Sequence, residues 1–431
     1  MFCYQCEQTP EGGCTKIGVC GKNKDIASLQ DTIIFGLKGI AAYSNHASEL
    51  GLSNHEVDKI TQEYLYMTLT NSNFSLEEHI NMALKVGSAA VKIMDTLDNG
   101  HTTKFGVPTP VVVPQNKIEG HLILVTGHNL HALHELLKQT EGKGINIYTH
   151  SEMLPAHGYP KLKKFSHLKG NVGKAWYDQR KLFEEFPGAI LGTTNCLMPI
   201  TVKGTYASRM WSYGVAGLEG IDKIENDDFA PIIEKALELP AVDIDSKETL
   251  LTGFHHETVL SIAPEIIQAV KDGKIKRFFV IAGCDAPTKG RDYYRKLATS
   301  LPNDCVILTT SCGKFRFNDV DYGVVEGTNI PRYIDLGQCN NSGSAAKIAI
   351  ALAEAFECDI NELPLTIVLS WFEQKAIAIL LGLFSLGVKN MYVGPTASKF
   401  ITPGVLGVLQ DTFGLKLISG DVKADMEIML G

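Results

Sequence analysis

The chain has little of what marks membrane, secreted or nucleic-acid-binding proteins. Its most apolar run, AIAILLGLFSLGV, falls short of the roughly 18–20 residues that span a bilayer and is interrupted by Gly382. No secretory signal precedes the first cysteines, because Cys3 and Cys6 stand where a basic leader segment would lie. The net charge of −8 gives no basic field for nucleic acid and argues against anionic lipid. We therefore expect a cytoplasmic protein that binds neither nucleic acid nor membrane.

Several cofactor-binding motifs are also missing. The sequence has no Gly-x-Gly-x-x-Gly after a strand, no Walker A loop and no His-Glu-x-x-His. NAD, flavin and ATP are therefore not expected as bound cofactors, and electrons for a redox reaction would come from a separate protein. A second Cys-x-x-Cys is absent as well, which weakens the case for a structural zinc site.

The 431 residues exceed the roughly 250–300 that one hydrophobic core usually serves, so two or three domains are expected. Apolar residues at helical spacing predict three helices in the first part of the chain. The predicted helices are 25–50 with Asp25 as N-cap, 54–71 with Asn54 as N-cap, and 75–100 with a Ser75/Glu78 capping box and a stop at Asn99-Gly100. Three prolines then end the helical pattern: Pro108, Pro110 and Pro114.

From residue 118 onward, short apolar runs alternate with helical stretches. The strand-like runs are HLILVTG, INIYTH, AILGTT, RFFVIAG, CVILTTS, RYIDLG, LTIVLS and NMYVGP. This alternation predicts parallel, doubly wound sheets. The expected fold is an α/β multidomain protein, with an N-terminal helical domain followed by two Rossmann-like domains. The predicted domains are 1–117, which includes the first cysteines, 118–240 and 241–431.

Side chains able to bind metal follow seven of these strands. They are His128, Glu152, Cys196, Cys284, Cys312, Cys339 and Glu373, with Lys375 two residues beyond the last. Open α/β sheets bind ligands outside the carboxyl ends of their strands. A single residue of this kind after a strand is ordinarily a packing or surface residue. Seven strands that are each followed by one form a pattern that chance rarely produces. Four thiolates, two carboxylates and an imidazole exceed the four ligands of zinc and favour a polynuclear iron centre with sulfide and oxygen bridges.

The opening segment holds four of the ten cysteines in the pattern Cys-x2-Cys-x7-Cys-x5-Cys. Four thiolates are the complement of a [4Fe–4S] cluster, and the glycines among them let backbone N–H groups approach the sulfurs. On spacing alone, a structural zinc site is the alternative. A cluster here, beside a buried second one, would act as an electron inlet. The two remaining cysteines are expected in the core, Cys305 in a strand and Cys358 on a helix.

Eight segments of the chain resemble the hybrid cluster protein (prismane protein) family, also known as hydroxylamine reductases. These segments are FCYQCEQT…GCTKIGVCGK, GHNLHALHELL, IYTHSEMLPAHGYPKL, GTTNCLMP, IAGCDAPTKGRDYY, LTTSCGKFRFN, DLGQCNNSGSA and WFEQKAIAILLGLFSLGVKN, in family order. The family is related to carbon monoxide dehydrogenase. The chain resembles its short branch, with a reduced N-terminal helical domain. A face left exposed by the missing helices favours a homodimer.

The resemblance implies two iron–sulfur clusters. A [4Fe–4S] cluster would be held by Cys3, Cys6, Cys14 and Cys20. A hybrid [4Fe-2O-2S] cluster would be held by His128, Glu152, Cys196, Cys284, Cys312, Cys339 and Glu373. In the family, the position of Cys284 carries a persulfide and Lys375 lies near the hybrid cluster. The catalytic candidates are His128, Glu373 and Lys375.

The expected activity is reduction of hydroxylamine to ammonia and water with two electrons and two protons, or reduction of nitric oxide to nitrous oxide on the same cluster. Electrons would come from an external donor, such as ferredoxin, rubredoxin or an NADH-dependent reductase. Two alternatives stay open. One is a carbon monoxide dehydrogenase, which nickel analysis would decide. The other is a nitric oxide sensor or trans-nitrosylase, which would pass nitroso groups to partner thiols.

Overall fold

The computed structural model describes residues 3–371 and 373–431. The chain forms two compact units, and each combines segments that are distant in the sequence. Unit 1 contains Met1–Gly100, Arg277–Cys284 and Ala349–Gly431, and unit 2 contains His101–Lys276 and Asp285–Ile348. The sequence predicted three consecutive domains with boundaries after residues 117 and 240, and these boundaries stay a prediction. Within the described residues, every helix is too short or too polar to cross a bilayer.

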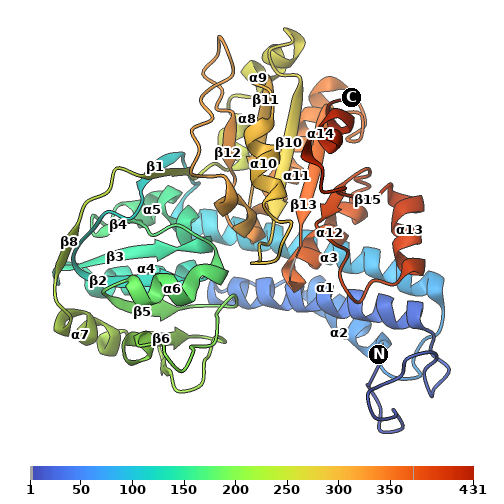
Figure 1. Ribbon diagram of the computed structural model, residues 1–431, viewed down its shortest axis with the longest axis horizontal. Helices are drawn as coiled ribbons and strands as arrows, with labels where there is room; N and C mark the ends of the chain where they lie inside the picture. Colours follow the sequence, from blue (N-terminus) through green and yellow to red (C-terminus); the bar gives the residue numbers. More distant parts are fainter. Residues whose placement is uncertain (1–2, 372) are drawn as a thin grey trace. The chain divides into compact units, whose positions relative to one another are not determined.

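Unit 1 begins with a loop that holds the first four cysteines, drawn dark blue in Figure 1, and continues into long helices. Its helices are α1 (Lys24–Glu49), α2 (His55–Met67), the main part of α3 (Leu76–Phe105), the C-terminal part of α11 (Ser342–Phe356), α12 (Gln374–Ser385), α13 (Pro403–Phe413) and α14 (Val422–Leu430). Glycines let three of these helices pack closely. A Cβ added to Gly39 of α1 would lie 2.7 Å from the Cβ of Ala378, and one added to Gly87 of α3 would lie 2.0 Å from the carbonyl oxygen of Leu381.

Two of the predicted helix starts are confirmed and one is wrong. Asn54 caps α2, and the hydroxyl of Ser75 accepts a hydrogen bond from the Glu78 N–H at the start of α3. The N-cap of α1 is Asn23, whose side chain accepts from a backbone N–H, and Asp25 lies inside the first turn. Asn and Asp are both good N-caps, so sequence alone does not separate two candidates that lie two residues apart.

The predicted end of the third helix is also wrong. α3 continues through Gly100 to Phe105. A Cβ at Gly100 would lie 2.6 Å from Cδ1 of Leu52, so this glycine permits a close side-chain contact inside the helix and does not end it.

Cys305 is fully buried at the start of a strand. Cys358 is half-buried in the turn that follows α11, so its predicted place on a helix is wrong.

The strands of unit 1 form parallel pairs in the order β10, β13, β14 and β15. Their bounds are Arg277–Gly283, Leu365–Ser370, Tyr392–Gly394 and Lys416–Leu417. The register pairs Gly283 with Ser370, so the carboxyl ends of β10 and β13 lie next to each other. Residues 284 and 373, both predicted ligands, follow these two ends.

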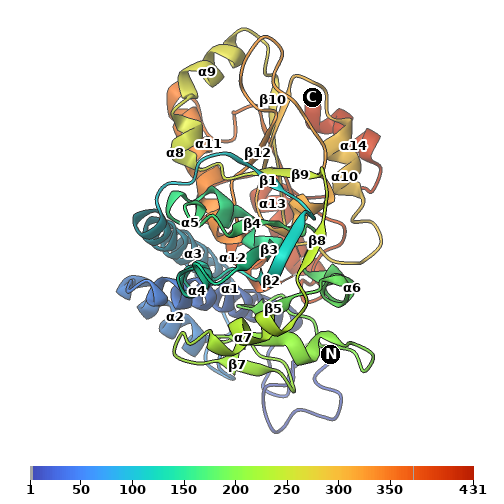
Figure 2. The same cartoon turned by 90° about the vertical axis from the view of Figure 1, so that its left-hand side faces the viewer.

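Unit 2 contains a parallel sheet of six strands in the order β4-β3-β2-β5-β6-β7, with β8 antiparallel to β2. Figures 1 and 2 show its central strands stacked in this order. The bounds are β2 Ile118–Thr126, β3 Ile145–His150, β4 Leu168–Asn171, β5 Ala189–Gly192, β6 Met210–Tyr213, β7 Asp222–Ile224 and β8 Val242–Ile244. Leu122, Leu124, Tyr148 and Ile190 are buried in one core cluster of this sheet. Burying each such side chain contributes about 1.5–3 kcal/mol.

Two smaller strand pairs complete unit 2. β1 (Val111–Pro114) pairs antiparallel with β9 (Thr249–Thr252), and β11 (Cys305–Thr309) pairs parallel with β12 (Tyr333–Asp335). The helices are α4 Leu130–Thr140, α5 Pro160–Lys163, α6 Gln179–Glu185, α7 Ala230–Glu238, α8 His256–Leu260, α9 Ala263–Lys271 and α10 Tyr293–Ser300. The predicted α/β fold, with N-terminal helices followed by parallel sheets, is confirmed.

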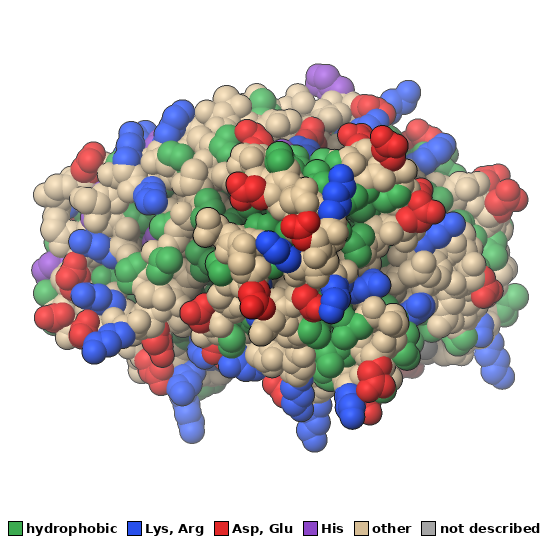
Figure 3. Space-filling model, turned by 90° about the horizontal axis from the view of Figure 1, so that it is seen from above, with side chains coloured by type: hydrophobic (Ala, Val, Ile, Leu, Met, Phe, Trp, Pro, Cys, Tyr) green, Lys and Arg blue, Asp and Glu red, His purple; other side chains and the backbone are tan. Residues whose placement is uncertain are grey.

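Charged side chains of both signs share the surface. On the face shown in Figure 3, Lys and Arg side chains lie among Asp and Glu side chains and do not gather into a separate basic field. This mixture agrees with the modest net charge of −8.

Candidate metal centre

The N-terminal loop brings two of its four cysteines together. Cys3 and Cys14 form an isolated antiparallel bridge, in which the Cys14 N–H donates to the Cys3 carbonyl at 2.8 Å. The buried side chain of Lys22 donates a hydrogen bond to Cys3 Sγ at 4.0 Å. Cys6 Sγ lies 3.4 Å from the Thr9 hydroxyl. The loop therefore offers sulfur with nearby donors, as a thiolate-bound cluster requires.

In unit 2, three predicted ligands meet in one buried group. One ligand atom each from His128, Glu152 and Cys339 lies within 4.8 Å of the others. His128 Nε2 is 3.8 Å from Glu152 Oε2, which also accepts a hydrogen bond from the Cys339 N–H at 2.8 Å. His128 Nδ1 lies 2.7 Å from the Thr194 hydroxyl, and this contact fixes the ring. All three side chains are almost completely buried, so the group is an interior one.

The strand ends explain how residues from distant parts of the chain meet. His128, Glu152 and Cys196 follow β2, β3 and β5, which are parallel neighbours in the sheet. Gly127 turns the chain after β2 with φ +110°, and a Cβ there would lie 2.4 Å from the Thr193 hydroxyl. Parallel strands bring their carboxyl ends to one edge, and the tight turn then aims the following side chain.

Three loops that carry predicted ligands, those after β3, β5 and β11, hold a non-glycine residue with positive φ. Ser151 has φ +53°, Cys196 φ +69° and Ser311 φ +69°. This conformation is strained for residues with a Cβ, and it tends to occur where function demands a particular backbone direction. Ser151 precedes Glu152 and Ser311 precedes Cys312, so both strained residues set the direction of a predicted ligand.

Gln338 ties the ligand loops of unit 2 together. Its side-chain amide donates to the carbonyl of His128 at 3.1 Å and to the carbonyl of Glu152 at 2.7 Å. The next residue is Cys339, whose N–H is bound to the Glu152 carboxylate. One buried amide therefore holds three predicted ligand loops in register. The sequence offered one signal for it, its position directly before a predicted ligand.

A buried ion pair clamps the Cys312 loop to the Cys339 loop. Lys314 Nζ donates to Asp335 Oδ1 at 2.7 Å and to the Gly337 carbonyl at 2.8 Å, and both charged side chains are 0% exposed. The Thr252 hydroxyl donates to the other oxygen of Asp335 at 2.8 Å. Lys314 lies two residues after Cys312, and Gly337 lies two residues before Cys339. The pair thereby fixes the spacing of two cysteine loops, a role that sequence reasoning missed.

Breaking this pair is expected to destabilise the protein strongly. Lys314→Met leaves the Asp335 carboxylate buried without its ammonium, which should lower the free energy of unfolding by about 3–5 kcal/mol. Lys235→Met is the matched control, because Lys235 and Glu238 are also 2.7 Å apart but are 33% and 64% exposed. That change should cost only about 0–1 kcal/mol. Urea titrations of both variants test this, and equal losses would contradict it.

Cys312 and Cys196 lie in the same unit but in different surroundings. Cys312 is buried, and its Sγ lies 3.5 Å from the Ser151 hydroxyl. The Ser311 N–H donates to the Gly337 carbonyl at 3.2 Å, so the Cys312 loop rests on the loop before Cys339. Cys196 is half-buried, and the Asn195 amide donates to its Sγ at 3.1 Å.

The other predicted residues of the hybrid site lie in unit 1. Cys284 is held on both sides of its backbone by Ser370: its N–H donates to the Ser370 carbonyl at 3.0 Å, and its carbonyl accepts from the Ser370 hydroxyl. Glu373 is the N-cap residue of α12, and Lys375 lies in the first turn. Lys375 is buried, with Nζ 5.9 Å from the centre of the Tyr43 ring. Glu373 and Lys375 therefore lie at the start of this helix.

Buried neutral histidines support the ligand loops. Burial lowers the pKa of His157 to about 4, and its Nε2 lies 2.9 Å from the Thr149 hydroxyl. Burial likewise lowers the pKa of His150, the residue that ends β3, to about 3. Both imidazoles are therefore neutral at neutral pH and serve as hydrogen-bonding groups.

His157 makes the fold sensitive to acid. Its folded pKa lies below its unfolded value, so below about pH 6.5 the unfolded chain binds a proton that the folded chain rejects. Stability from this group is present above the unfolded pKa and falls by about 1.4 kcal/mol per pH unit as pH drops toward the folded pKa. His157→Gln should flatten the stability profile between pH 6 and 4 relative to the exposed control His55→Gln. Parallel slopes in the two variants would rule this out.

The donor set fits an iron–sulfur–oxygen centre. In unit 2, buried sulfur, imidazole nitrogen and carboxylate oxygen face one another, and softer and harder ligands are thus combined at one place. Among the described residues, the N-terminal cysteines form no group of three within 4.8 Å.

A family model described as the Prismane/CO dehydrogenase family matches residues 1–81 and 75–427. The chain belongs to the Prismane/CO dehydrogenase family. It is 56% identical over 432 residues to a hydroxylamine reductase of Moorella thermoacetica and 49% identical over 433 residues to one of Methanothermobacter thermautotrophicus, with full coverage of all chains. A hydroxylamine reductase of Trichormus variabilis is 48% identical, and this chain covers 76% of its length. The predicted resemblance to the short branch is confirmed.

Solved structures show the same fold. Carbon monoxide dehydrogenase IV of Carboxydothermus hydrogenoformans matches with a TM-score of 0.77 over 99% of this chain and 91% of that one, at 14% identity. A nickel-free carbon monoxide dehydrogenase of Thermococcus sp. AM4 matches with the same TM-score at 18% identity. Likeness at this level of identity concerns the fold alone. Membership of the family supports an iron–sulfur oxidoreductase.

Proposed function

We propose that this chain reduces hydroxylamine to ammonia and water, with reduction of nitric oxide to nitrous oxide as a variant of the same chemistry. The observation that carries the proposal is the buried group of His128, Glu152 and Cys339, a donor set with nitrogen, oxygen and sulfur. Relatives named hydroxylamine reductase, 49–56% identical over the full chain, support it.

The proposed cofactors are a [4Fe–4S] cluster and a hybrid [4Fe-2O-2S] cluster. The first would be held by Cys3, Cys6, Cys14 and Cys20. The second would be held by His128, Glu152, Cys196, Cys284, Cys312, Cys339 and Glu373, with Cys284 as a persulfide. When bound, the hybrid cluster would supply redox-active iron that accepts a small ligand as a Lewis acid.

Protons would be handled by the start of α12. Reduction of hydroxylamine takes up two electrons and two protons, and cleavage of the N–O bond yields ammonia and water. Lys375 is buried in the first helical turn and Glu373 occupies the N-cap position, so a basic and an acidic side chain belong to the same end of this helix. Lys375 Nζ would donate a proton to the departing oxygen, and Glu373 would orient the substrate N–H groups. His128, which belongs to the buried group with Glu152 and Cys339, would also orient the substrate.

Electrons would reach the hybrid cluster through the N-terminal cluster. The sequence has no nucleotide-binding motif, so an external donor such as ferredoxin, rubredoxin or an NADH-dependent reductase would supply them. We place the reaction in the cytoplasm, where thiols stay reduced. A homodimer is the proposed assembly.

Anaerobic steady-state assays test the proposed function. With a reduced dye as donor, the protein should form ammonia from hydroxylamine over many turnovers. No more than one equivalent of ammonia or nitrous oxide would favour a nitric oxide sensor or trans-nitrosylase. Stoichiometric nickel together with carbon monoxide oxidation would identify a carbon monoxide dehydrogenase.

A further inference from the structure

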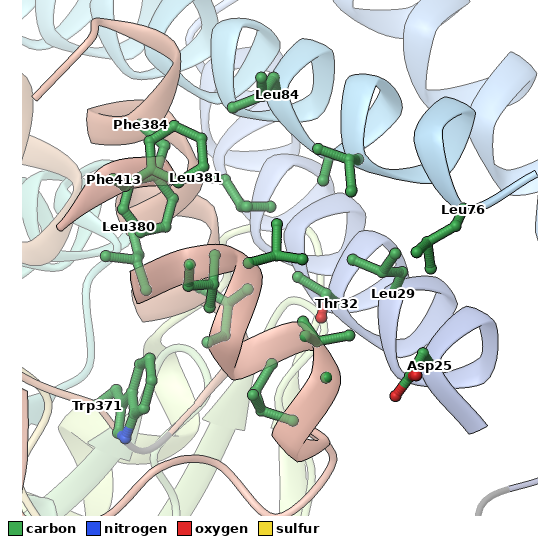
Figure 4. Close-up of a pocket in the computed structure, with 18 residues that line it drawn as sticks. Asp25, Leu29, Thr32, Leu76, Leu84, Trp371, Leu380, Leu381, Phe384 and Phe413 are labelled. Carbon is green, nitrogen blue, oxygen red and sulfur yellow. The ribbon is translucent and has the colours of Figure 1, made fainter. Parts of the chain in front are cut away.

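Two cavities, one in each unit, differ in the chemistry of their walls. The cavity in unit 1, shown in Figure 4, is lined almost entirely by hydrocarbon side chains. Polar groups on its wall have partners inside the protein: the Asp25 carboxylate accepts from the Thr402 hydroxyl, and the Thr32 hydroxyl donates to the Ser28 carbonyl at 2.8 Å. These groups need no ligand to complete their hydrogen bonds.

The pocket in unit 2 is larger and more polar, with a volume of about 610 Å³. Its wall is formed by residues of the paired strands β1 and β9, by the loop 318–323 and by Tyr333 of β12. All of these segments belong to unit 2. Pockets of about 300–1,000 Å³ hold ligands of the size of a metabolite or a drug.

Three polar side chains of this wall are more than nine-tenths buried. Gln115, Asn318 and Tyr333 are 8%, 7% and 4% exposed. Within the described residues, Asn318 Nδ2 and Tyr333 Oη find no hydrogen-bond partner. A buried polar group without a partner destabilises a fold, and native proteins hold few of them. A ligand that supplies the missing partners would remove this penalty.

The charged groups of the pocket are exposed and favour a ligand without charge. The lining residues include the carboxylates of Glu248, Asp319 and Asp321 and the ammonium of Lys174. This excess of negative charge disfavours a phosphate or carboxylate ligand. Each carboxylate already accepts a hydrogen bond from a group of the protein, so it creates little need for a cation.

The buried groups select a ligand that donates and accepts hydrogen bonds. The carboxamides of Gln115 and Asn318 each offer two N–H donors and one acceptor, and such a group matches N6 and N7 of adenine with two hydrogen bonds. Burial, together with the charge of Asp335, raises the pKa of Tyr333, so its hydroxyl keeps the proton that it can donate. The Tyr333 ring is stacked on the Tyr322 ring, with centres 5.5 Å apart, and both residues line the pocket. A planar base packs well on an aromatic wall.

We propose that this pocket binds an uncharged molecule that carries a purine base, of the class of adenosine. Gln115 and Asn318 contact the edge of the base, and the Tyr333 hydroxyl donates a further hydrogen bond. The nucleotide-binding motifs that the sequence lacks bind phosphate groups, so a nucleoside does not require them. None of the predicted cluster ligands lines the pocket, and the site does not rest on the proposed function.

Isothermal titration calorimetry of the purified holoprotein with adenosine tests the site without any turnover. We expect saturable binding with one site per chain. Adenosine 5′-monophosphate should bind roughly tenfold more weakly, because its phosphate meets the carboxylates of the wall. No saturable binding of adenosine up to millimolar concentration, or tighter binding of the monophosphate, would overturn the proposal.

Two neighbouring tyrosines give a matched pair of variants. The Tyr333 hydroxyl lacks a partner among the described residues, whereas the Tyr322 hydroxyl donates to the Phe317 carbonyl at 3.1 Å. Tyr333→Phe should weaken adenosine binding roughly tenfold and leave the midpoint of urea denaturation unchanged. Tyr322→Phe should lower that midpoint and keep the affinity within about twofold. Equal effects of the two variants on affinity, or the reverse pattern, would contradict a contact between the ligand and Tyr333.

A third variant tests the contact with the base. Gln115→Met keeps the length of the side chain and removes the carboxamide, so it should also weaken adenosine binding roughly tenfold. Unchanged affinity in both Gln115→Met and Tyr333→Phe would overturn the proposal.

Discussion

Replacing Cys312 with serine is expected to remove the paramagnetic signal of the second cluster and to reduce hydroxylamine turnover by roughly a thousandfold, a loss of about 4 kcal/mol in transition-state stabilisation. Cys312 is buried, and its loop is clamped by the ion pair of Lys314 and Asp335. The serine oxygen would therefore occupy nearly the same place, but it is a harder and less acidic ligand than a thiol. The loss would thus report ligation and not a displaced loop.

Two observations distinguish ligation from a general effect on the fold. The signal of the N-terminal cluster should persist in Cys312→Ser, because its four cysteines lie in a separate loop of unit 1. Cys358→Ser is the matched control: Cys358 is half-buried in the turn after α11 and should keep both signals and full activity. If Cys312→Ser retained full iron and turnover, Cys312 would not be a ligand.

Replacing Gly283 with alanine is expected to lower the free energy of unfolding by about 3–5 kcal/mol and to reduce the iron content of the second cluster. Gly283 ends β10 with φ +109°, and a Cβ there would lie 1.9 Å from the Ser370 carbonyl oxygen. That carbonyl accepts the hydrogen bond from the Cys284 N–H. Relief of the clash must separate β10 from β13 at the point where both predicted ligands, Cys284 and Glu373, leave the sheet.

A second glycine separates the clash from backbone strain. Gly273 also has a positive φ, +71°, but a Cβ there would meet nothing within 4 Å. Gly273→Ala should therefore cost only about 1 kcal/mol and leave the iron content unchanged. Denaturation midpoints and iron counts of both variants provide the measurement. Equal effects at the two positions would show that strain alone, and not contact with Ser370, matters at Gly283.

Local patterns in the sequence were sufficient to predict the elements. Short apolar runs such as INIYTH and RFFVIAG correspond to β3 and β10 residue by residue, because a buried parallel strand is apolar on both faces. The same logic placed His128 and Glu152 directly after strands, and the structure brings them within 3.8 Å of each other. The interruption of α3 at Gly100 was predicted wrongly, since a glycine can serve a distant contact with Leu52 as well as a local turn.

The supports of the site could not be read from the sequence because they join residues far apart in the chain. Gln338 holds the carbonyls of His128 and Glu152, which are 210 and 186 positions away. Lys314 and Asp335 resemble ordinary surface residues until their burial is known. The hydrophobic periodicity of the sequence does not predict such pairings, because they depend on the order of the strands in the sheets.

The most direct test is an anaerobic count of iron and acid-labile sulfide per chain, combined with electron paramagnetic resonance. Two clusters predict about eight iron atoms and two distinct signals, more iron than a single cube can hold. A chain that binds about four iron atoms with one signal, or that binds zinc in their place, would contradict a second cluster on the strand ends of this fold.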